Sequence, residues 1–238
     1  MLRLPPIPQS AAYHQFADQR KWLGIPNFEN VISNIPFAVV GLLGLQFLLR
    51  SKPGRLKQVF VDSRERNPYV LAFVGLFLTA FGSAYYHLAP TNARLVWDRL
   101  PMTLVFSSLV AVVIIERISV EAGTKLLPLL VAVAAGSVLQ WYFDELRGHG
   151  DLRLYAAVQL YSALVLLMAL LLKTRYSRGY DFAIVAGFYL LAKILESADG
   201  YIFAHGYIVS GHTIKHLAAA AAGFWILQML QRREPLAR

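Results

Sequence analysis

Three histidines, one serine and one aspartate have the types and the spacing of a metal-dependent hydrolase site. Ser83 and His87 are four residues apart in an apolar stretch, and His212 and His216 repeat that spacing near the C-terminus. Residues four apart share one face of an α-helix. Three imidazoles leave one position of a tetrahedral zinc open for water, and a carboxylate such as Asp98 can accept a proton from that water. The pattern therefore predicts a zinc centre with the three histidines as ligands.

Asp98 and Ser83 are predicted to act beside the metal. Asp98 would orient the water, take its proton and pass that proton to a leaving amine. Ser83 would donate a hydrogen bond to the water or to the oxyanion of a tetrahedral intermediate. The alternative for Ser83 is a hydroxyl bonded back to its own helix. For the histidines, the alternative is a buried hydrogen-bond network that joins helices.

The composition is typical of a membrane protein with several spans. Of the 238 residues, 57% are hydrophobic and only 16% are charged, and the mean hydropathy is +0.48. The chain has no cysteine, which excludes disulfides and thiolate metal sites, so any transition metal must be held by histidine and carboxylate. The net charge is +9. Because the basic residues lie in short loops between apolar runs, we expect the bilayer surface, and no nucleic acid, as the anionic partner.

Seven apolar runs predict one all-α domain that covers residues 1–238. Residues 1–29 are a polar, aromatic segment expected at the membrane interface, and residues 30–231 are the helix bundle. The first span begins with Asn30, Ser33 and Asn34, which indicates either a cavity-lining end or helix capping. The predicted spans are about 30–49, 68–88, 100–115, 126–143, 154–172, 182–203 and 212–230.

The distribution of basic residues predicts the orientation of the bundle. Fourteen of the 23 lysines and arginines fall in loops on the side of the C-terminus and seven on the side of the N-terminus. The positive-inside rule therefore favours an N-out, C-in topology. An odd number of spans also places Ser83, His87, Asp98, His212 and His216 at one membrane face. The N-terminus has no apolar leader, and we expect a bacterial inner membrane with the site toward the periplasm.

Other ionisable residues are given simpler roles. His14, His149 and His205 lie in loops or in the interfacial segment and are expected to be ordinary surface residues. Lys193 and Glu196 are three residues apart and are expected to pair. That pair, or Asp144 with Glu145, could also orient a metal-bound imidazole.

These motifs together resemble the alkaline ceramidase family. That family belongs to a wider group of seven-span metallohydrolases that includes the adiponectin-receptor-like proteins. The shared pattern is Ser83, His87, Asp98 and then LPM, followed much later by His212 and His216. The run WDRLPM is similar to the family's DELPM, with arginine at position 99 where glutamate is common. The run NVISNIPFAVVGL, residues 30–42, looks like the family's first span.

The resemblance implies hydrolysis of a ceramide amide to a sphingoid base and a fatty acid, with zinc at the three histidines and Asp98 and Ser83 beside the water. It also implies a calcium site in the N-terminal segment. Asp18 falls on the family's acidic position, whereas Asn27 stands where a glutamate is usual, and residues 19–23 lack the other acidic ligand. Calcium prefers six to eight oxygens, several of them charged. Arg20 or Lys21 could supply the positive charge in place of the ion.

We therefore expect a zinc-dependent intramembrane amidase that acts on ceramide, or on a related long-chain lipid amide, entering from the bilayer. A hydrolase of another lipid amide or of a lipid ester is the nearest alternative. A receptor-like or structural membrane protein whose zinc ties helices together is the alternative from another class. An ion or proton transporter would be expected to have broken helices in matching halves, which the sequence lacks.

Overall fold

The computed structural model describes residues 5–236, and this part of the chain is all-helical. Two isolated bridges, Trp22 with Ile25 and Tyr176 with Pro235, are its only β-type pairs. The α-helices are α1 (Phe28–Ile32), α2 (Ile35–Arg50), α3 (Pro53–Val59), α4 (Arg66–Leu88), α5 (Asn92–Arg117), α6 (Val120–Leu146), α7 (Arg153–Met168), α8 (Asp181–Ser197), α9 (Asp199–Ala204) and α10 (Gly211–Arg232). Three short 3-10 helices are η1 (Ala11–His14), η2 (Ser63–Glu65) and η3 (Ala169–Leu171). The predicted all-α class is confirmed.

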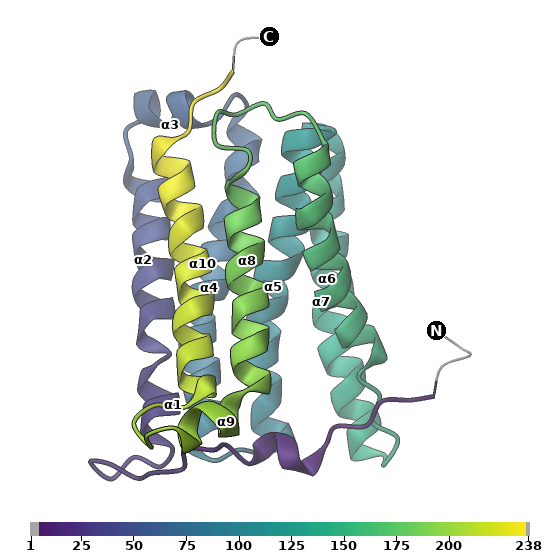
Figure 1. The fold of residues 1–238 in the computed structure, drawn as a ribbon. Helices are drawn as coiled ribbons and strands as arrows, with labels where there is room; N and C mark the ends of the chain where they lie inside the picture. Colours follow the sequence, from purple (N-terminus) through teal and green to yellow (C-terminus); the bar gives the residue numbers. More distant parts are fainter. Residues whose placement is uncertain (1–4, 237–238) are drawn as a thin grey trace.

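The long helices lie side by side in one bundle (Figure 1). Helices α1 and α9 and the N-terminal segment lie at one end of it, which we call the α9 end. Helix α3 and the chain after α10 lie at the opposite end, which we call the α3 end. The N-terminal segment is tied across the α9 end, because Leu152 donates its backbone N–H to the Ile7 carbonyl at 2.8 Å.

Five helical segments are long and apolar enough to cross a membrane. In the two that contain α6 and α7, only 22% of the most apolar stretch is buried inside the protein. Large side chains such as Leu129, Val133, Leu160 and Leu164 are exposed. So much exposed apolar surface is unfavourable in water and is matched by lipid tails. The structure therefore supports a helical membrane protein.

Two glycines let helices approach closely at the α9 end. A Cβ atom on Gly82 of α4 would lie 1.9 Å from the Trp97 carbonyl oxygen of α5. A Cβ on Gly211, the first residue of α10, would lie 2.2 Å from the Leu195 oxygen of α8. Any side chain at these positions would push the helices apart, so glycine is required. The two contacts bring the start of α10 and the end of α4 next to their neighbours.

Four predicted spans have different ends in the structure. The first is divided at Ser33 into α1 and α2, because Pro36 lies in the first turn of α2, where its missing N–H does no harm. The third is longer than predicted, since the Thr91 side chain caps α5 and starts it at Asn92. The fourth, predicted to start near residue 126, is α6 and starts at Val120. The sixth was predicted to continue to residue 203, but α8 ends at Ser197 and the separate helix α9 follows.

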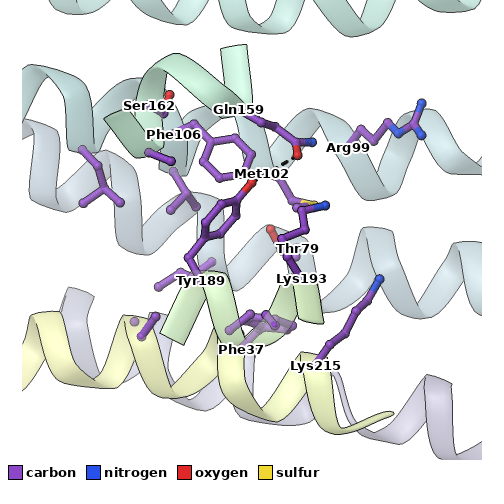
Figure 2. Close-up of a pocket in the computed structure, with 18 of the residues that line it drawn as sticks. Phe37, Thr79, Arg99, Met102, Phe106, Gln159, Ser162, Tyr189, Lys193 and Lys215 are labelled. Carbon is purple, nitrogen blue, oxygen red and sulfur yellow. Dashed lines mark hydrogen bonds between the residues drawn. The ribbon is translucent and has the colours of Figure 1, made fainter. Parts of the chain in front are cut away.

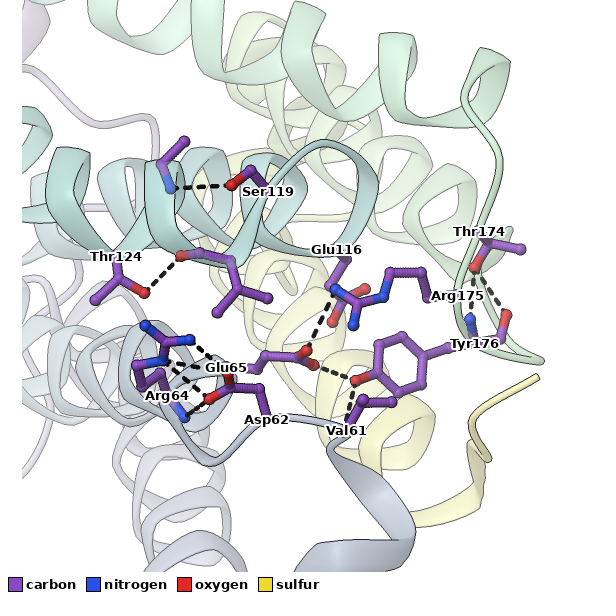
Figure 3. A network of polar contacts seen from close by, with 12 residues as sticks. Val61, Asp62, Arg64, Glu65, Glu116, Ser119, Thr124, Thr174, Arg175 and Tyr176 are labelled. Atoms are coloured by element: carbon purple, nitrogen blue, oxygen red, sulfur yellow. Dashed lines mark hydrogen bonds and ion pairs between the residues drawn. The ribbon is translucent and has the colours of Figure 1, made fainter. Parts of the chain in front are cut away.

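A buried polar network closes the α3 end (Figure 3). Glu65 is fully buried, accepts a hydrogen bond from the Tyr176 hydroxyl and lies 3.5 Å from the Arg175 guanidinium. A second buried pair joins Arg233, just after α10, to Glu116 of α5. The Tyr69 hydroxyl of α4 also donates to Glu116, at 2.7 Å. The network therefore holds two segments in place at the α3 end. Arg175 and Tyr176, which precede α8, bond to Glu65, and Arg233, which follows α10, bonds to α4 and α5.

Candidate metal centre

The three predicted histidines meet at the α9 end. His87 lies in the last turn of α4, and His212 and His216 lie in the first turns of α10. One ring nitrogen from each lies within 4.8 Å of the others, and all three side chains are buried. Ser210 caps α10 by accepting a hydrogen bond from the Thr213 N–H, which fixes where the helix starts and so where both histidines point. These three residues could hold a metal ion.

The closest nitrogens have the separation expected of two ligands on one metal. His212 Nε2 and His87 Nε2 are 3.4 Å apart. An N–H···N hydrogen bond is normally shorter, at about 3 Å, whereas two imidazole nitrogens bound to a tetrahedral zinc at about 2.0–2.1 Å lie roughly 3.3–3.4 Å apart. The chemistry of the set also suits a transition metal, since imidazole is a common ligand for zinc, copper, iron and nickel. The residues present therefore fit a metal ion of this class.

Ser33 contacts the imidazole of His216. Its hydroxyl oxygen lies 3.2 Å from the Asn30 carbonyl oxygen and 2.8 Å from His216 Nδ1. A metal on Nε2 requires the tautomer in which Nδ1 carries the proton. In that tautomer Nδ1 donates to the Ser33 hydroxyl, and the hydroxyl donates to the Asn30 carbonyl.

The other two histidines are positioned mainly through their backbones and by packing. The Asp199 carboxylate accepts the His212 backbone N–H at 2.7 Å, and the Asn27 amide donates to the His87 carbonyl oxygen at 2.8 Å. The Phe16 ring packs against both imidazoles, with centroid distances of 4.6 Å. His87 Nδ1 is buried and has no hydrogen-bond partner among the described residues.

Ser83 and Asp98 lie together beside this cluster. Ser83 lies next to Asp98 across the close α4–α5 contact at Gly82. Both side chains line one cavity, and His216 lines it too. The structure therefore brings Ser83, Asp98 and one predicted metal ligand to the same space.

The cavity has a volume of about 340 Å³, and its basic side chains lie toward one end (Figure 2). Figure 2 shows Arg99, Lys193 and Lys215 toward one end and Phe106 and Ser162 toward the other. Apolar side chains from several helices form most of the wall, among them Phe37, Leu76, Val105, Leu109, Leu166 and Ile226. A cavity with this division suits a molecule that has a long apolar chain and a polar group.

Tyr13 of the N-terminal segment covers the polar end. Its side chain lines the cavity, and its hydroxyl donates to Glu196 at 3.4 Å. Burial raises the pKa of Tyr13, and the nearby Glu196 carboxylate raises it further. The hydroxyl is therefore a neutral donor near pH 7.

The predicted calcium residues Asp18 and Asn27 make other contacts. Arg20 binds both carboxylate oxygens of Asp18, through Nε at 2.8 Å and Nη2 at 2.7 Å. The same guanidinium donates to the carbonyl oxygens of Tyr207 and Ile208 at 2.8 and 2.7 Å. Burial alone would raise the Asp18 pKa, but the hydrogen bonds from Arg20 hold it below its usual value.

Arg20 thus supplies the positive charge among these oxygens. Calcium would need six to eight oxygen ligands, whereas the Asp18 carboxylate is bound at both oxygens by Arg20 and the Asn27 amide is directed at the His87 carbonyl. The residues present do not fit a calcium ion.

Several residues have roles that the sequence reasoning missed. His14 was predicted to be an ordinary surface residue, but its Nδ1 lies 2.9 Å from the Tyr86 hydroxyl and its Nε2 2.8 Å from Asn92 Oδ1. Asp199 and Phe16 were not singled out as partners of the histidines. The sequence offers one indication of these contacts. Polar residues such as Asn30 and Ser33 are costly to bury at the start of an apolar span, which suggests that they have polar partners.

The acidic residues considered as partners of the imidazoles bond elsewhere. Asp144 lies 3.6 Å from Arg147, and Glu145 accepts a hydrogen bond from Asn92 at 3.0 Å. Glu196 pairs with Lys193 at 3.0 Å, as predicted, and also with Lys215. Ser33 hydrogen-bonds to the His216 imidazole, and Asp199 hydrogen-bonds to the His212 backbone N–H.

A comparison of the chain with models of known protein families gave no match, and neither did a comparison with curated proteins. The interpretation of the centre therefore depends on its own geometry and on the sequence motifs.

Proposed function

We propose that this protein is a zinc-dependent intramembrane amidase that hydrolyses ceramide or a related long-chain lipid amide to an amine, such as a sphingoid base, and a fatty acid. One observation carries the proposal: His216, from the buried histidine cluster, lines the same amphiphilic cavity as Ser83 and Asp98. A metal, an acid–base pair and space for an acyl chain are the requirements of lipid amide hydrolysis. The resemblance of the motifs to alkaline ceramidases favours ceramide.

The proposed arrangement in the membrane has seven spans. To the five apolar segments it adds α8, with 17 residues, and α10, with 22. The N-out, C-in orientation follows from the distribution of basic residues and would place the α9 end on the outer face. We propose a bacterial inner membrane, in which this end faces the periplasm and the substrate enters the cavity laterally from the bilayer.

The residues can be assigned to the steps of hydrolysis. Zinc bound here would polarise the scissile carbonyl and lower the pKa of a water molecule. Asp98 takes one proton as the water oxygen bonds to the carbonyl carbon, and gives that proton to the nitrogen as the carbon–nitrogen bond breaks. Ser83 donates a hydrogen bond to the oxyanion. Ser33 keeps Nε2 of His216 unprotonated throughout.

The alternatives differ in what they require of Asp98. A site that only ties helices together, in a receptor-like or structural protein, needs no carboxylate beside an open metal position. The Ser83–Asp98 pair in the cavity wall therefore favours a hydrolase. A different lipid amide or a lipid ester would use the same residues.

The test measures zinc content and turnover on the same samples. The purified full-length chain is compared with His216→Ala, Asp98→Asn and the control His149→Ala, whose histidine is exposed. We expect about one zinc per chain, lost in His216→Ala. Asp98→Asn should keep zinc and lose ceramide hydrolysis by roughly a hundredfold or more. Zinc without turnover of any lipid amide or ester would support the structural alternative, and a metal-free native protein would refute the zinc centre.

A further inference from the structure

The polar end of the cavity has two lysines that share one carboxylate. Glu196 of α8 lies between Lys193 of the same helix, at 3.0 Å, and Lys215 of α10, at 2.5 Å. An ammonium group has three N–H donors, and within residues 5–236 Glu196 is the only hydrogen-bond partner of either ammonium group. Each lysine therefore keeps donors for a ligand, and a single negative charge is set against two positive charges.

Arg99 adds a further positive charge to the same wall. Its side chain is only 5% exposed, and its Nη2 donates to the uncharged Gln9 amide oxygen at 2.7 Å. Within the described residues it forms no ion pair, and its guanidinium stacks on Trp141 at 4.4 Å and on Tyr155 at 4.9 Å. Arg99 is thus held by aromatic faces, with no carboxylate bound to it directly.

The charges of the described lining do not balance. Arg99, Lys193 and Lys215 are cationic, whereas Asp98 and Glu196 are the only carboxylates that line the cavity. A buried charge is costly unless an opposite charge compensates it. The excess positive charge lies at the polar end, opposite the apolar wall that would hold an acyl chain. An anionic group on the ligand would remove the imbalance.

From this distribution we propose that the cavity selects N-acyl lipids that carry a carboxylate on the amine side of the amide, the N-acyl amino acids, over neutral amides such as ceramide. The inference rests on the proposed amidase function and names its substrate class. The acyl chain lies along the apolar wall, the amide lies at His216, Asp98 and Ser83, and the carboxylate is bound by Lys193 and Lys215. Lys215 and His216 line the same cavity, so the ammonium and the reacting amide would share one space.

Binding of matched ligands tests the proposal without turnover. N-palmitoylglycine and N-palmitoylethanolamine share the chain and the amide and differ in a carboxylate against a hydroxyl. Each is titrated against the full-length protein carrying Asp98→Asn in detergent micelles, with palmitate as a third ligand. We expect N-palmitoylglycine to bind roughly tenfold or more tightly than N-palmitoylethanolamine, since charge-assisted hydrogen bonds are the stronger class.

Two substitutions added to Asp98→Asn should move this preference in opposite directions. Lys215→Met should reduce the preference about tenfold, whereas Glu196→Gln, which frees both ammonium groups, should increase it. The control Lys125→Met removes an exposed lysine that pairs with Glu121 and should leave the preference unchanged. Misfolding cannot produce a tighter preference, so Glu196→Gln keeps the test sound if Lys215→Met is unstable.

Three results would overturn the proposal. They are equal binding of the two amides, a preference that Lys215→Met leaves unchanged, and palmitate binding that depends on Lys215 as strongly as N-palmitoylglycine binding does. The last would mean that the lysines bind the free acid. Ceramide hydrolysis by the native protein together with equal binding would retain the amidase and reject this substrate class. A clear preference for N-palmitoylglycine with no cleavage of either amide by the native protein would retain the carboxylate selectivity and reject the amidase.

Discussion

Ser33 Oγ lies 2.8 Å from His216 Nδ1 and 3.2 Å from the Asn30 carbonyl oxygen, so a residue of the α1–α2 junction is placed to hold His216 with Nε2 directed at a metal. The pair joins the first helical segment of the bundle to the last. His216 would bind the metal, and Ser33 would orient the His216 ring.

Ser33→Ala should therefore weaken metal binding without removing a ligand. Loss of a partner that orients a ligand typically costs about 10–100-fold in metal affinity. Zinc affinity is measured by competition with a chelator in detergent. Ser137→Ala is the matched control, because Ser137 is also buried but bonds only to the Ala134 carbonyl of its own helix. Equal zinc affinity in the two variants would show that Ser33 does not control the tautomer.

Gly82→Ala should separate the two helices that carry Ser83 and Asp98. The new Cβ would lie 1.9 Å from the Trp97 carbonyl oxygen, a backbone atom that cannot rotate away. We expect a loss of about 3 kcal/mol in the free energy of unfolding and a clear fall in any hydrolysis. Gly136→Ala is the control, since its Cβ meets nothing within 4 Å and the change should gain up to about 1 kcal/mol of helix propensity. Unfolding in detergent measures both, and similar effects at the two sites would contradict the close contact.

Much of the candidate site could be predicted because its spacing is local. Ser83 with His87, and His212 with His216, are each one helical turn apart, and a helix of any packing keeps such pairs on one face. Which helix faces which is not encoded so locally. The Ser33–His216 bond and the Asp199–His212 bond depend on how α10 packs on α1 and α9, so no spacing in the sequence predicts them.

The ends of the helices show the same limit. Hydropathy placed the start of the third span near residue 100, because Asn92, Arg94, Asp98 and Arg99 interrupt the apolar residues before it. A span this short is expected to extend at its polar end, and the Thr91 cap sets that extension at Asn92. The break after Ser197 lies in the polar run 196–200, and the apolar residues 201–203 that follow extended the predicted span across it. The seven-span topology and its orientation stay predictions.

Acid should release the N-terminal segment from the α9 end. Hydrogen bonds from Arg20 hold the Asp18 pKa below its usual 3.8. A carboxyl group whose pKa is lower in the folded state stabilises the protein above the unfolded-state pKa, and this contribution is lost as the pH falls through the folded-state pKa. The difference in the free energy of unfolding between the native protein and Asp18→Asn should therefore be largest near pH 7 and decrease below about pH 4.

Unfolding in detergent at several pH values measures this difference. Asp62→Asn is a useful control, because its pKa is also low, at about 2, through Arg64, yet it lies at the α3 end. Proteolysis near residue 20 should increase in acid for the native protein and should already be high at neutral pH for Asp18→Asn. If the stability difference between the native protein and Asp18→Asn stays constant with pH, the Asp18–Arg20 ion pair does not hold the N-terminal segment in place.

Arg233→Ala should lower the free energy of unfolding much more than Arg232→Ala does. The Arg233 guanidinium is buried, pairs with Glu116, and donates from Nη1 to the Tyr69 hydroxyl at 3.0 Å and from Nε to the Val59 carbonyl at 3.1 Å. Removing one partner of a buried ion pair leaves an uncompensated charge, which typically costs about 3–5 kcal/mol. Arg232→Ala is the adjacent control, because Arg232 is exposed.

The double variant Arg233→Met with Glu116→Gln should recover much of the lost stability, since it leaves no unpaired charge. Equal stability of Arg233→Ala and Arg232→Ala would mean that the pair contributes nothing to the fold.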